Sequence, residues 1–181
     1  MKYAVLLRGV NVGGKNKISM SVLKSSLEEA DFKDVVTLLN SGNVVISHSS
    51  SNKKQIAKKI ENLLTQNFTF DSELIKVLVL NSDELEAVIK NAPAHFGSQP
   101  EKYHSDVVYL IDVDTEEAFK IFNINPEVDS VWKGDGVIYF QRLSEKRTKS
   151  KLSRIISTPI YKSMTIRTWN TTVKLLDLLT A

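Results

Sequence analysis

The sequence predicts an α+β protein built from two tandem ferredoxin-like βαββαβ units, with a linking helix between them and an extra helix at the C-terminus. Apolar runs and helical stripes follow the same β-α-β-β-α-β order in residues 1–80 and again in residues 106–181. Each half also contains two short apolar runs around a glycine-bearing turn, which is typical of a hairpin. The repeat therefore lies in the order of the elements and not in residue identity.

Residues 1–80 are predicted to form the first unit. A short apolar run opens it, and the turn at 40–43 stands between two further apolar runs. Ser19 is the expected N-cap of the first helix, because a serine just before an apolar helical stripe can accept the unpaired N–H groups there. The expected elements are strand 3–7, helix 20–30, strands 35–39 and 44–47, helix 52–67 and strand 74–80.

Residues 81–105 are predicted to contain the linking helix and a loop, and residues 106–181 the second unit with the C-terminal helix. The loop at 93–105 holds proline, glycine and serine, which break regular structure. Asp114 begins a capping-box sequence, and Asn170 is the expected cap of the last helix. The expected elements are helix 83–91, strand 107–113, a helix from Asp114, strands 128–132 and 137–141, helix 150–158, strand 164–167 and helix 171–179.

The composition excludes several classes of protein. Because no run of about 18 apolar residues occurs, no membrane-spanning segment is expected, and Arg8 ends the first apolar run too early for a signal peptide. The absence of cysteine rules out disulfides, thiolate zinc sites and cysteine nucleophiles. His48, His95 and His104 show no metal-ligand spacing. We therefore expect a cytoplasmic protein with no metal and no cofactor.

The most informative motif is the loop Arg8-Gly-Val-Asn-Val-Gly-Gly-Lys15, which directly follows an apolar strand. Glycines let backbone N–H groups turn toward a guest, and Arg8 and Lys15 supply positive charge, which is the chemistry of an anion cradle. The spacing approaches a phosphate-binding P-loop, but Asn16 stands where that motif has the Mg²⁺-binding serine or threonine. A glycine turn that only reverses the chain is an equal alternative.

The predicted connectivity gathers two polar clusters. In the first unit, strand one and the hairpin turn end at the same sheet edge, which brings residues 9–17 next to residues 40–43. In the second unit, strands three and four both end at the opposite edge, which brings residues 142–151 near residues 167–170. The candidate ligand-binding residues are Arg8, Asn11, Gly13, Gly14, Lys15, Asn40, Ser41, Asn43, Lys149, Ser150, Lys151, Arg167, Trp169 and Asn170.

These candidates also have a purely structural interpretation. Residues 40–43 suit a turn, because asparagine and glycine tolerate positive φ. Lys149-Ser150-Lys151 suits a phosphate at a helix N-terminus, but Ser150 also suits a plain N-cap. Trp169 suits either stacking on a ring of a ligand or packing in the core.

Two long motifs in these regions resemble one bacterial family. The first is Leu7-Arg-Gly-Val-Asn-Val-Gly-Gly14 with Met20 and Leu39-Asn-Ser-Gly-Asn-Val-Val45, and the second is Ser150-Lys-Leu152 and Arg167-Thr-Trp-Asn-Thr171 with Lys174. Together they are similar to the domain-of-unknown-function family 1697 over nearly the whole chain. The family usually has Asn-Trp-Asn where this chain has Thr168-Trp-Asn170, so one amide is missing here. The resemblance implies a tandem ferredoxin-like fold and supplies no activity.

The sequence leaves the function unknown, with three classes open. The leading hypothesis is a small binding protein for an anionic ligand, such as a nucleotide or nucleic-acid phosphate, in which basic side chains bind charge and asparagines orient the guest. The second is an enzyme acting on a phosphorylated substrate, although no residues stand out as general acid and base. The third is a structural or protein-interaction module.

Overall fold

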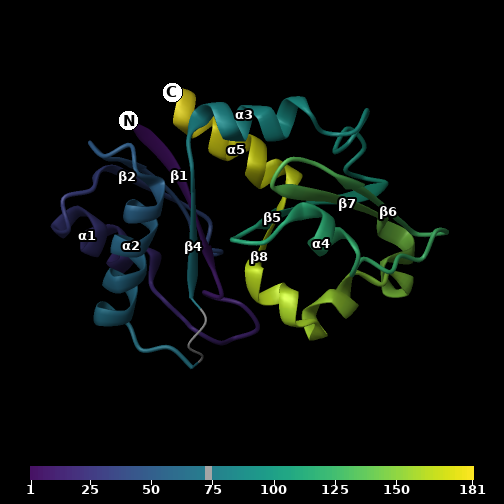
Figure 1. Cartoon of the computed structure of the whole chain (residues 1–181), viewed down its shortest axis with the longest axis horizontal. Coiled ribbons are helices and arrows are strands. Elements are labelled where there is room, and N and C mark those ends of the chain that lie inside the picture. Colours follow the sequence, from purple (N-terminus) through teal and green to yellow (C-terminus); the bar gives the residue numbers. More distant parts are fainter. Residues whose placement is uncertain (72–74) are drawn as a thin grey trace. The chain divides into compact units, whose positions relative to one another are not determined.

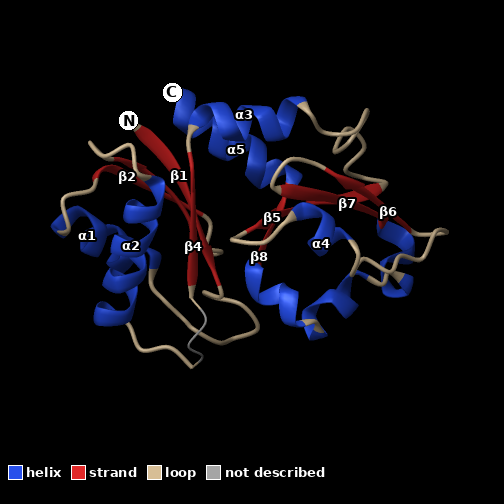
Figure 2. Ribbon diagram, in the orientation of Figure 1, coloured by secondary structure: helices blue, strands red, loops and turns tan. Residues whose placement is uncertain are grey.

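The computed structural model describes residues 1–71 and 75–181. The protein has the predicted α+β class, with two four-stranded antiparallel sheets and, in the described part of the chain, five α-helices (Figures 1 and 2). It divides into two compact units, one formed by Met1–Leu85 with Leu175–Ala181 and the other by Glu86–Lys174. Helices α3 (Ser82–Lys90) and α5 (Trp169–Thr180) each cross this division along the sequence.

The first unit is a four-stranded sheet with two helices on one face (Figure 1). The strand order is β2-β3-β1-β4, so the first strand lies in the interior of the sheet. Helix and sheet together bury a core that includes Val5, Leu23 and Ile60. The elements are β1 (Lys2–Arg8), α1 (Met20–Glu29), β2 (Lys33–Leu38), β3 (Asn43–Ser47), α2 (Lys53–Asn67) and β4 (Lys76–Leu80).

The second unit has the strand order β6-β7-β5-β8, again with neighbouring strands antiparallel. Because side chains alternate along a strand, β5 buries both faces. Val108 belongs to a core with the following helix, whereas the Tyr109 hydroxyl donates to Thr172 Oγ1 of α5 at 3.1 Å. The elements are β5 (Tyr103–Leu110), α4 (Thr115–Phe119), β6 (Asp129–Lys133), β7 (Val137–Leu143) and β8 (Met164–Thr168).

Local sequence patterns placed most of these elements correctly. Ser19, Asn52 and Asp114 cap α1, α2 and α4, each by accepting a hydrogen bond from a backbone N–H of the first turn. The predicted strand 74–80 corresponds to β4, and its first residue, Leu74, lies outside the described residues.

β5 begins earlier than the predicted strand 107–113. Its first residues pair with the end of β7, Tyr103 with Leu143 and His104 with Arg142. The sequence predicted a loop here because hydrophobic periodicity identifies only the buried part of a strand. Backbone pairing with β7 extends the strand over these polar residues at the end of the sheet. His104 therefore lies on a strand and not in a linker.

The predicted helix 150–158 is not an α-helix. The chain after β7 instead forms three 3₁₀ segments, Ser144–Lys149, Leu152–Ser157 and Pro159–Ser163. Serine, threonine and β-branched isoleucine weaken an α-helix in this stretch, and Pro159 removes a backbone donor. The segment thus lacks the aligned N–H groups of a long helix, on which part of the predicted phosphate site depended.

The last helix begins before the predicted residue 171, and its cap is Thr168 and not Asn170. Thr168 Oγ1 accepts a hydrogen bond from Thr171 N at 3.3 Å, which is an N-cap arrangement. Trp169 and Asn170 consequently occupy the first turn of α5. The side chain of Asn170 is therefore not needed as a cap.

Tyr139 makes a buried hydrogen bond in the second unit, donated from its hydroxyl to Val88 O at 2.6 Å. Burial raises the pKa of Tyr139 from 10.0 to about 12. The unfolded chain therefore loses this proton at lower pH than the folded protein does. The stability that this shift contributes is complete below pH 10.0 and is lost as the pH rises toward 12.

We expect Tyr139→Phe to cost about 1–3 kcal/mol near neutral pH, because it removes a hydrogen bond and leaves the buried Val88 carbonyl unsatisfied. The deficit relative to wild type should shrink as the pH rises from 10.0 to 12. Urea unfolding followed by tryptophan fluorescence measures it, since Trp132 and Trp169 both belong to the second unit. A deficit that stays constant over this range would contradict the shifted pKa.

Candidate functional site

The loop between β1 and α1, residues 9–17, contains a miniature hairpin. A backbone hydrogen bond from Lys15 N to Val12 O, 3.0 Å long, closes its tip. Gly13 and Gly14 form that tip with φ of 59° and 78°, the left-handed pair that a two-residue type I′ turn requires. An added Cβ would meet nothing within 4 Å at either glycine, so backbone conformation and not crowding demands glycine here.

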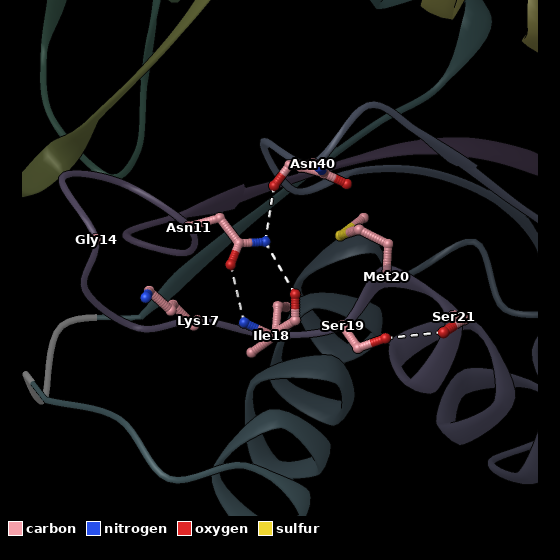
Figure 3. A pocket seen from close by; sticks show the side chains of 8 residues that line it. All are labelled: Asn11, Gly14, Lys17, Ile18, Ser19, Met20, Ser21 and Asn40. Carbon is pink, nitrogen blue, oxygen red and sulfur yellow. Dashed lines mark hydrogen bonds between the residues drawn. The ribbon is translucent and has the colours of Figure 1, made fainter.

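Asn11 joins this loop to two other segments (Figure 3). Its Nδ2 donates to Asn40 O at 2.7 Å and to Ile18 O at 3.1 Å, and its Oδ1 accepts from Ile18 N at 2.8 Å. The turn at 40–43 thus lies beside the loop, as the connectivity predicted. Because both polar atoms of the amide are engaged within the protein, Asn11 fixes the shape of this region.

Other predicted residues near this loop also have structural roles or lie apart from the pocket. Asn43 is fully buried, and its Nδ2 donates to Leu38 O at 3.0 Å and to Ser41 Oγ at 2.9 Å. Its amide therefore holds the turn. Arg8 is half-buried at the end of β1, and Lys15 is exposed at the hairpin tip.

A pocket of about 720 Å³ lies between the hairpin loop, the turn at 40–43 and the start of α1 (Figure 3). Its volume is within the range of small-molecule sites, about 300–1,000 Å³. Only three of the predicted residues of this region line it, and Arg8 and Lys15 do not. The lining residues are Asn11, Gly14, Lys17, Ile18, Ser19, Met20, Ser21 and Asn40.

The start of α1 supplies the part of this wall that the sequence interpretation missed. Ser19 Oγ accepts from Val22 N at 3.4 Å and shares a 2.8 Å hydrogen bond with Ser21 Oγ. The first turn contains no acidic residue, so the partial positive charge of the helix N-terminus is not offset there. Lys17 adds a full charge to the same wall. A lysine and two serines around a predicted N-cap were the available clue.

Asn16 explains why the P-loop-like spacing does not form a P-loop. Its side chain is buried, Nδ2 donates to Gly9 O at 2.7 Å, and Oδ1 accepts from Asp71 N at 2.7 Å. The backbone N of Asn16 also donates to Asp71 Oδ2 at 3.1 Å. A P-loop lysine opens its helix, whereas three residues separate Lys15 from the N-cap of α1.

The basic segment at 149–151 lies against a carboxylate of the protein itself. Lys151 N donates to Asp129 Oδ2 at 3.0 Å, and Asp129 is only 3% exposed. The backbone donor expected to hold a phosphate is thus occupied. Ser150 Oγ accepts from Leu152 N at 3.2 Å, which is a local turn contact.

Arg167 is buried inside the second unit. It is 6% exposed, and its Nη1 donates to Thr165 Oγ1 and to Ile166 O, each at 2.8 Å. Burial lowers the pKa of Arg167 from 12.5 to about 10. Its guanidinium is thus bound by groups of the second unit itself.

Trp169 and Asn170 line a second, smaller pocket of about 180 Å³, which lies within the second unit. Phe96 packs edge-on against the Trp169 indole, with 5.2 Å between the ring centroids, so the indole is both a packing partner and a pocket wall. Neither Arg167 nor residues 149–151 contribute. The lining residues are Gly97, Pro100, Tyr103, His104, Ser105, Thr168, Trp169 and Asn170.

His104 and Asp106 form a pair at this second pocket that the sequence did not reveal. His104 Nε2 lies 3.0 Å from Asp106 Oδ1, and Arg142 Nη2 lies 3.4 Å from Asp106 Oδ2. The Asp106 side chain is 6% exposed and that of His104 is 44% exposed. Residues two apart share one face of a strand, but this spacing was invisible while His104 was assigned to a loop.

Within residues 1–71 and 75–181, no three His, Cys, Asp or Glu side chains gather so that they could hold a metal ion. In the same part of the chain, no helix combines the length and the apolar character needed to cross a membrane.

Comparison with known proteins identifies the family. The family described as "Protein of unknown function (DUF1697)" has a model that matches residues 1–139. The chain belongs to this family. The match ends within β7, so it includes every residue that lines the larger pocket and also the His104–Asp106 pair. The DUF1697 assignment confirms the resemblance inferred from the first motif, whereas the second motif, in residues 150–174, lies beyond the matched residues.

The chain is also similar in structure to the conserved bacterial protein SP0830 from Streptococcus pneumoniae, with a TM-score of 0.79 and 24% sequence identity. The similarity covers 98% of each chain. At this identity it shows the fold alone. No curated protein matches the chain.

Proposed function

We propose that the first unit binds an anionic, phosphate-bearing small molecule in the pocket at the start of α1. The observation that carries this proposal is the composition of one wall, where Lys17, the hydroxyls of Ser19 and Ser21 and the N-terminus of α1 border about 720 Å³ of space. Positive charge, hydroxyl donors and backbone donors together favour an anion over a neutral guest.

The first turn of α1 supplies the directional part of this recognition. The first N–H groups of a helix have no intrahelical acceptor, and Ser19 Oγ takes the N–H of Val22 at a long 3.4 Å. We assign the N–H groups of Met20 and Ser21 to the oxygens of the guest. Lys17 then neutralises the negative charge of the guest, whose oxygens these N–H groups bind.

The remainder of the pocket favours a guest with an apolar part. Ile18 and Met20 line it beside the polar residues, and Figure 3 shows Met20 beneath Asn40. A mononucleotide combines a phosphate with a flat, largely apolar base and suits a pocket of this volume. A phosphate of nucleic acid has the same chemistry at the α1 end, so the experiments below include it.

We also propose that the protein consists of two ferredoxin-like units in tandem. The sheet orders β2-β3-β1-β4 and β6-β7-β5-β8 support this arrangement, with 3₁₀ segments replacing the second helix of the second unit. A cytoplasmic location, where nucleotides are abundant, is the setting that we infer for such a binding protein.

We expect Lys17→Ala to weaken nucleotide binding by about tenfold, the equivalent of about 1.4 kcal/mol, because it removes the one lysine of the wall. Titration calorimetry with a panel of mononucleotides measures the affinity. Lys15→Ala is the matched control, since it removes the same charge from the exposed hairpin tip and should change the affinity less than about twofold. The proposal would be refuted if no mononucleotide of the panel changed the melting temperature of the wild-type protein. It would also be refuted if Lys17→Ala and the wild type bound mononucleotides equally well.

Salt separates the two sources of phosphate. A single-stranded oligonucleotide that makes many phosphate contacts should lose affinity steeply between low and moderate salt, whereas a mononucleotide held by one lysine should lose little. Titrations of both ligands at several salt concentrations give the two slopes. A steep slope for the oligonucleotide with no mononucleotide binding would assign the pocket to nucleic acid.

Ser21→Asp should move stability and binding in opposite directions. An aspartate in the first turn of α1, where no acidic residue stands, should stabilise the helix by about 0.3–1 kcal/mol through the helix dipole. The same charge should repel a phosphate and reduce its affinity by about tenfold. Urea unfolding and calorimetry on one preparation measure both effects. A loss of stability together with unchanged binding would contradict the assignment.

A further inference from the structure

The second unit contains an arrangement that the proposed binding function does not use. His104 lies at the start of β5, its cross-strand neighbour on β7 is Arg142, and the neighbour of Arg142 on β6 is Asp129. Asp106 follows His104 on the same face of β5. A half-exposed imidazole is thus backed by buried charges at the edge of a pocket of about 180 Å³.

The geometry points to a proton-transfer site, in which His104 acts as general base for the hydrolysis of a small acyl ester. Asp106 Oδ1 lies 3.0 Å from His104 Nε2. When Nε2–H donates to this carboxylate, the neutral imidazole carries its lone pair on Nδ1. Asp106 therefore fixes both the tautomer and the ring orientation, as carboxylates do behind catalytic histidines.

Arg142 forms an ion pair with the carboxylate of Asp106. Its Nη2 lies 3.4 Å from Asp106 Oδ2, and the Arg142 side chain is 24% exposed. The positive charge of the guanidinium offsets part of the cost of burying the Asp106 side chain. On the neighbouring strand β6, Asp129 Oδ2 accepts from the backbone N of Asn125 and of Lys151, each at 3.0 Å. Asp106 and Arg142 are positioning residues in this proposal.

The rest of the pocket fits a small acyl group. Asn170, in the first turn of α5, lines the pocket and offers amide N–H groups to an oxyanion. The rings of Tyr103 and Trp169 supply apolar wall. About 180 Å³ accommodates an acetyl-sized group and lies below the range of about 300–1,000 Å³ for drug-sized ligands, so the expected substrate is a short-chain carboxylic ester.

The reaction balances without a metal or a redox partner. His104 Nδ1 takes a proton from water as the water oxygen forms a bond to the ester carbonyl carbon. The tetrahedral intermediate then collapses, the bond from carbon to the alkoxy oxygen breaks, and the leaving alkoxide takes the proton back from His104. One ester and one water give one carboxylic acid and one alcohol.

The test uses the whole chain with p-nitrophenyl acetate as the probe and follows the absorbance of p-nitrophenolate. Acetylation of the amino groups releases at most one p-nitrophenolate per lysine and N-terminus, so product well beyond the number of amino groups in the chain shows catalytic turnover. His104→Gln keeps an N–H donor at the Nε2 position for Asp106 but has no basic nitrogen. It should lower the rate by about 100-fold, in line with general-base catalysis, with an unchanged urea midpoint.

Two further variants separate catalysis from packing. His104→Gly should regain rate when imidazole is added, which a merely structural histidine would not produce. His95→Asn removes an exposed loop histidine at φ 64°, which asparagine tolerates, and should keep the wild-type rate. The calorimetric titrations with mononucleotides do not depend on this rate, so this proposal and the proposed binding function can fail independently. A folded His104→Gln protein with the wild-type rate would overturn the proposal, and so would a wild type that does not turn over.

Discussion

Asn16→Ser is expected to lower the free energy of unfolding of the first unit by about 3 kcal/mol, although it completes the P-loop pattern of two glycines, lysine and serine. The serine cannot reach both partners of the asparagine, Gly9 O and Asp71 N, which lie at 2.7 Å from the amide. Asn16 is 3% exposed, so Gly9 O and Asp71 N would each lose a hydrogen-bond partner at a buried position. The φ of 48° also suits asparagine better than serine.

Hydrogen exchange of amides in β1 and β3 measures this loss, because both tryptophans lie in the second unit and do not report on the first. Asn40→Ser is the matched control. Asn40 is exposed, and its backbone carbonyl, which the substitution retains, is the group that accepts from Asn11. Asn40→Ser should lower the free energy of unfolding by less than about 0.5 kcal/mol. Asn16→Ser should gain no Mg²⁺-dependent ATP binding. An Asn16→Ser protein of wild-type stability that binds Mg²⁺-ATP would reverse our interpretation of the loop.

The elements that the sequence predicted well depend on neighbours in the chain. A cap such as Ser19 or Asp114 accepts a hydrogen bond from an N–H two or three residues later, so a short window contains the whole interaction. The predicted connectivity also placed the turn at 40–43 beside the loop at 9–17. Residues 150–158 were assigned wrongly because spacing alone suggested a helix that serine, threonine and isoleucine do not support.

The polar residues of the candidate sites could not be sorted in this way. Asn16 and Asp71 are 55 residues apart, and Asp129 and Lys151 are 22 apart. An asparagine or a backbone N–H has the same sequence pattern whether its partner is a ligand or a distant part of the chain. Lys17 was overlooked although it stands just before the expected N-cap Ser19, because a lysine there lines a pocket only when a distant segment, here the turn with Asn40, forms the rest of the wall.

Gly42→Ala is expected to destabilise the first unit by about 3 kcal/mol, through a left-handed backbone and a steric conflict. Its φ is 73°, and a Cβ would lie 2.5 Å from Val10 Cγ2 and 2.8 Å from Leu7 Cβ. Leu7 Cβ cannot move without the interior strand β1, and Leu7 N already donates to Gly42 O at 2.8 Å. The hairpin turn at 40–43 would therefore have to separate from the sheet, together with its contact to Asn11.

Gly14→Ala separates the two contributions, because Gly14 has nearly the same φ, 78°, with nothing within 4 Å of an added Cβ. It should cost about 1–2 kcal/mol, the backbone contribution alone. Hydrogen exchange of amides in β1 and β3 gives the loss of free energy of unfolding for each variant. We expect the two losses to differ by about 1–3 kcal/mol, which is the contribution of packing the turn against the sheet. If the two substitutions cost the same, the close approach of Gly42 to Leu7 would not constrain the turn. The pocket beside it would then lack the fixed wall on which our proposal of ligand binding at Lys17 depends.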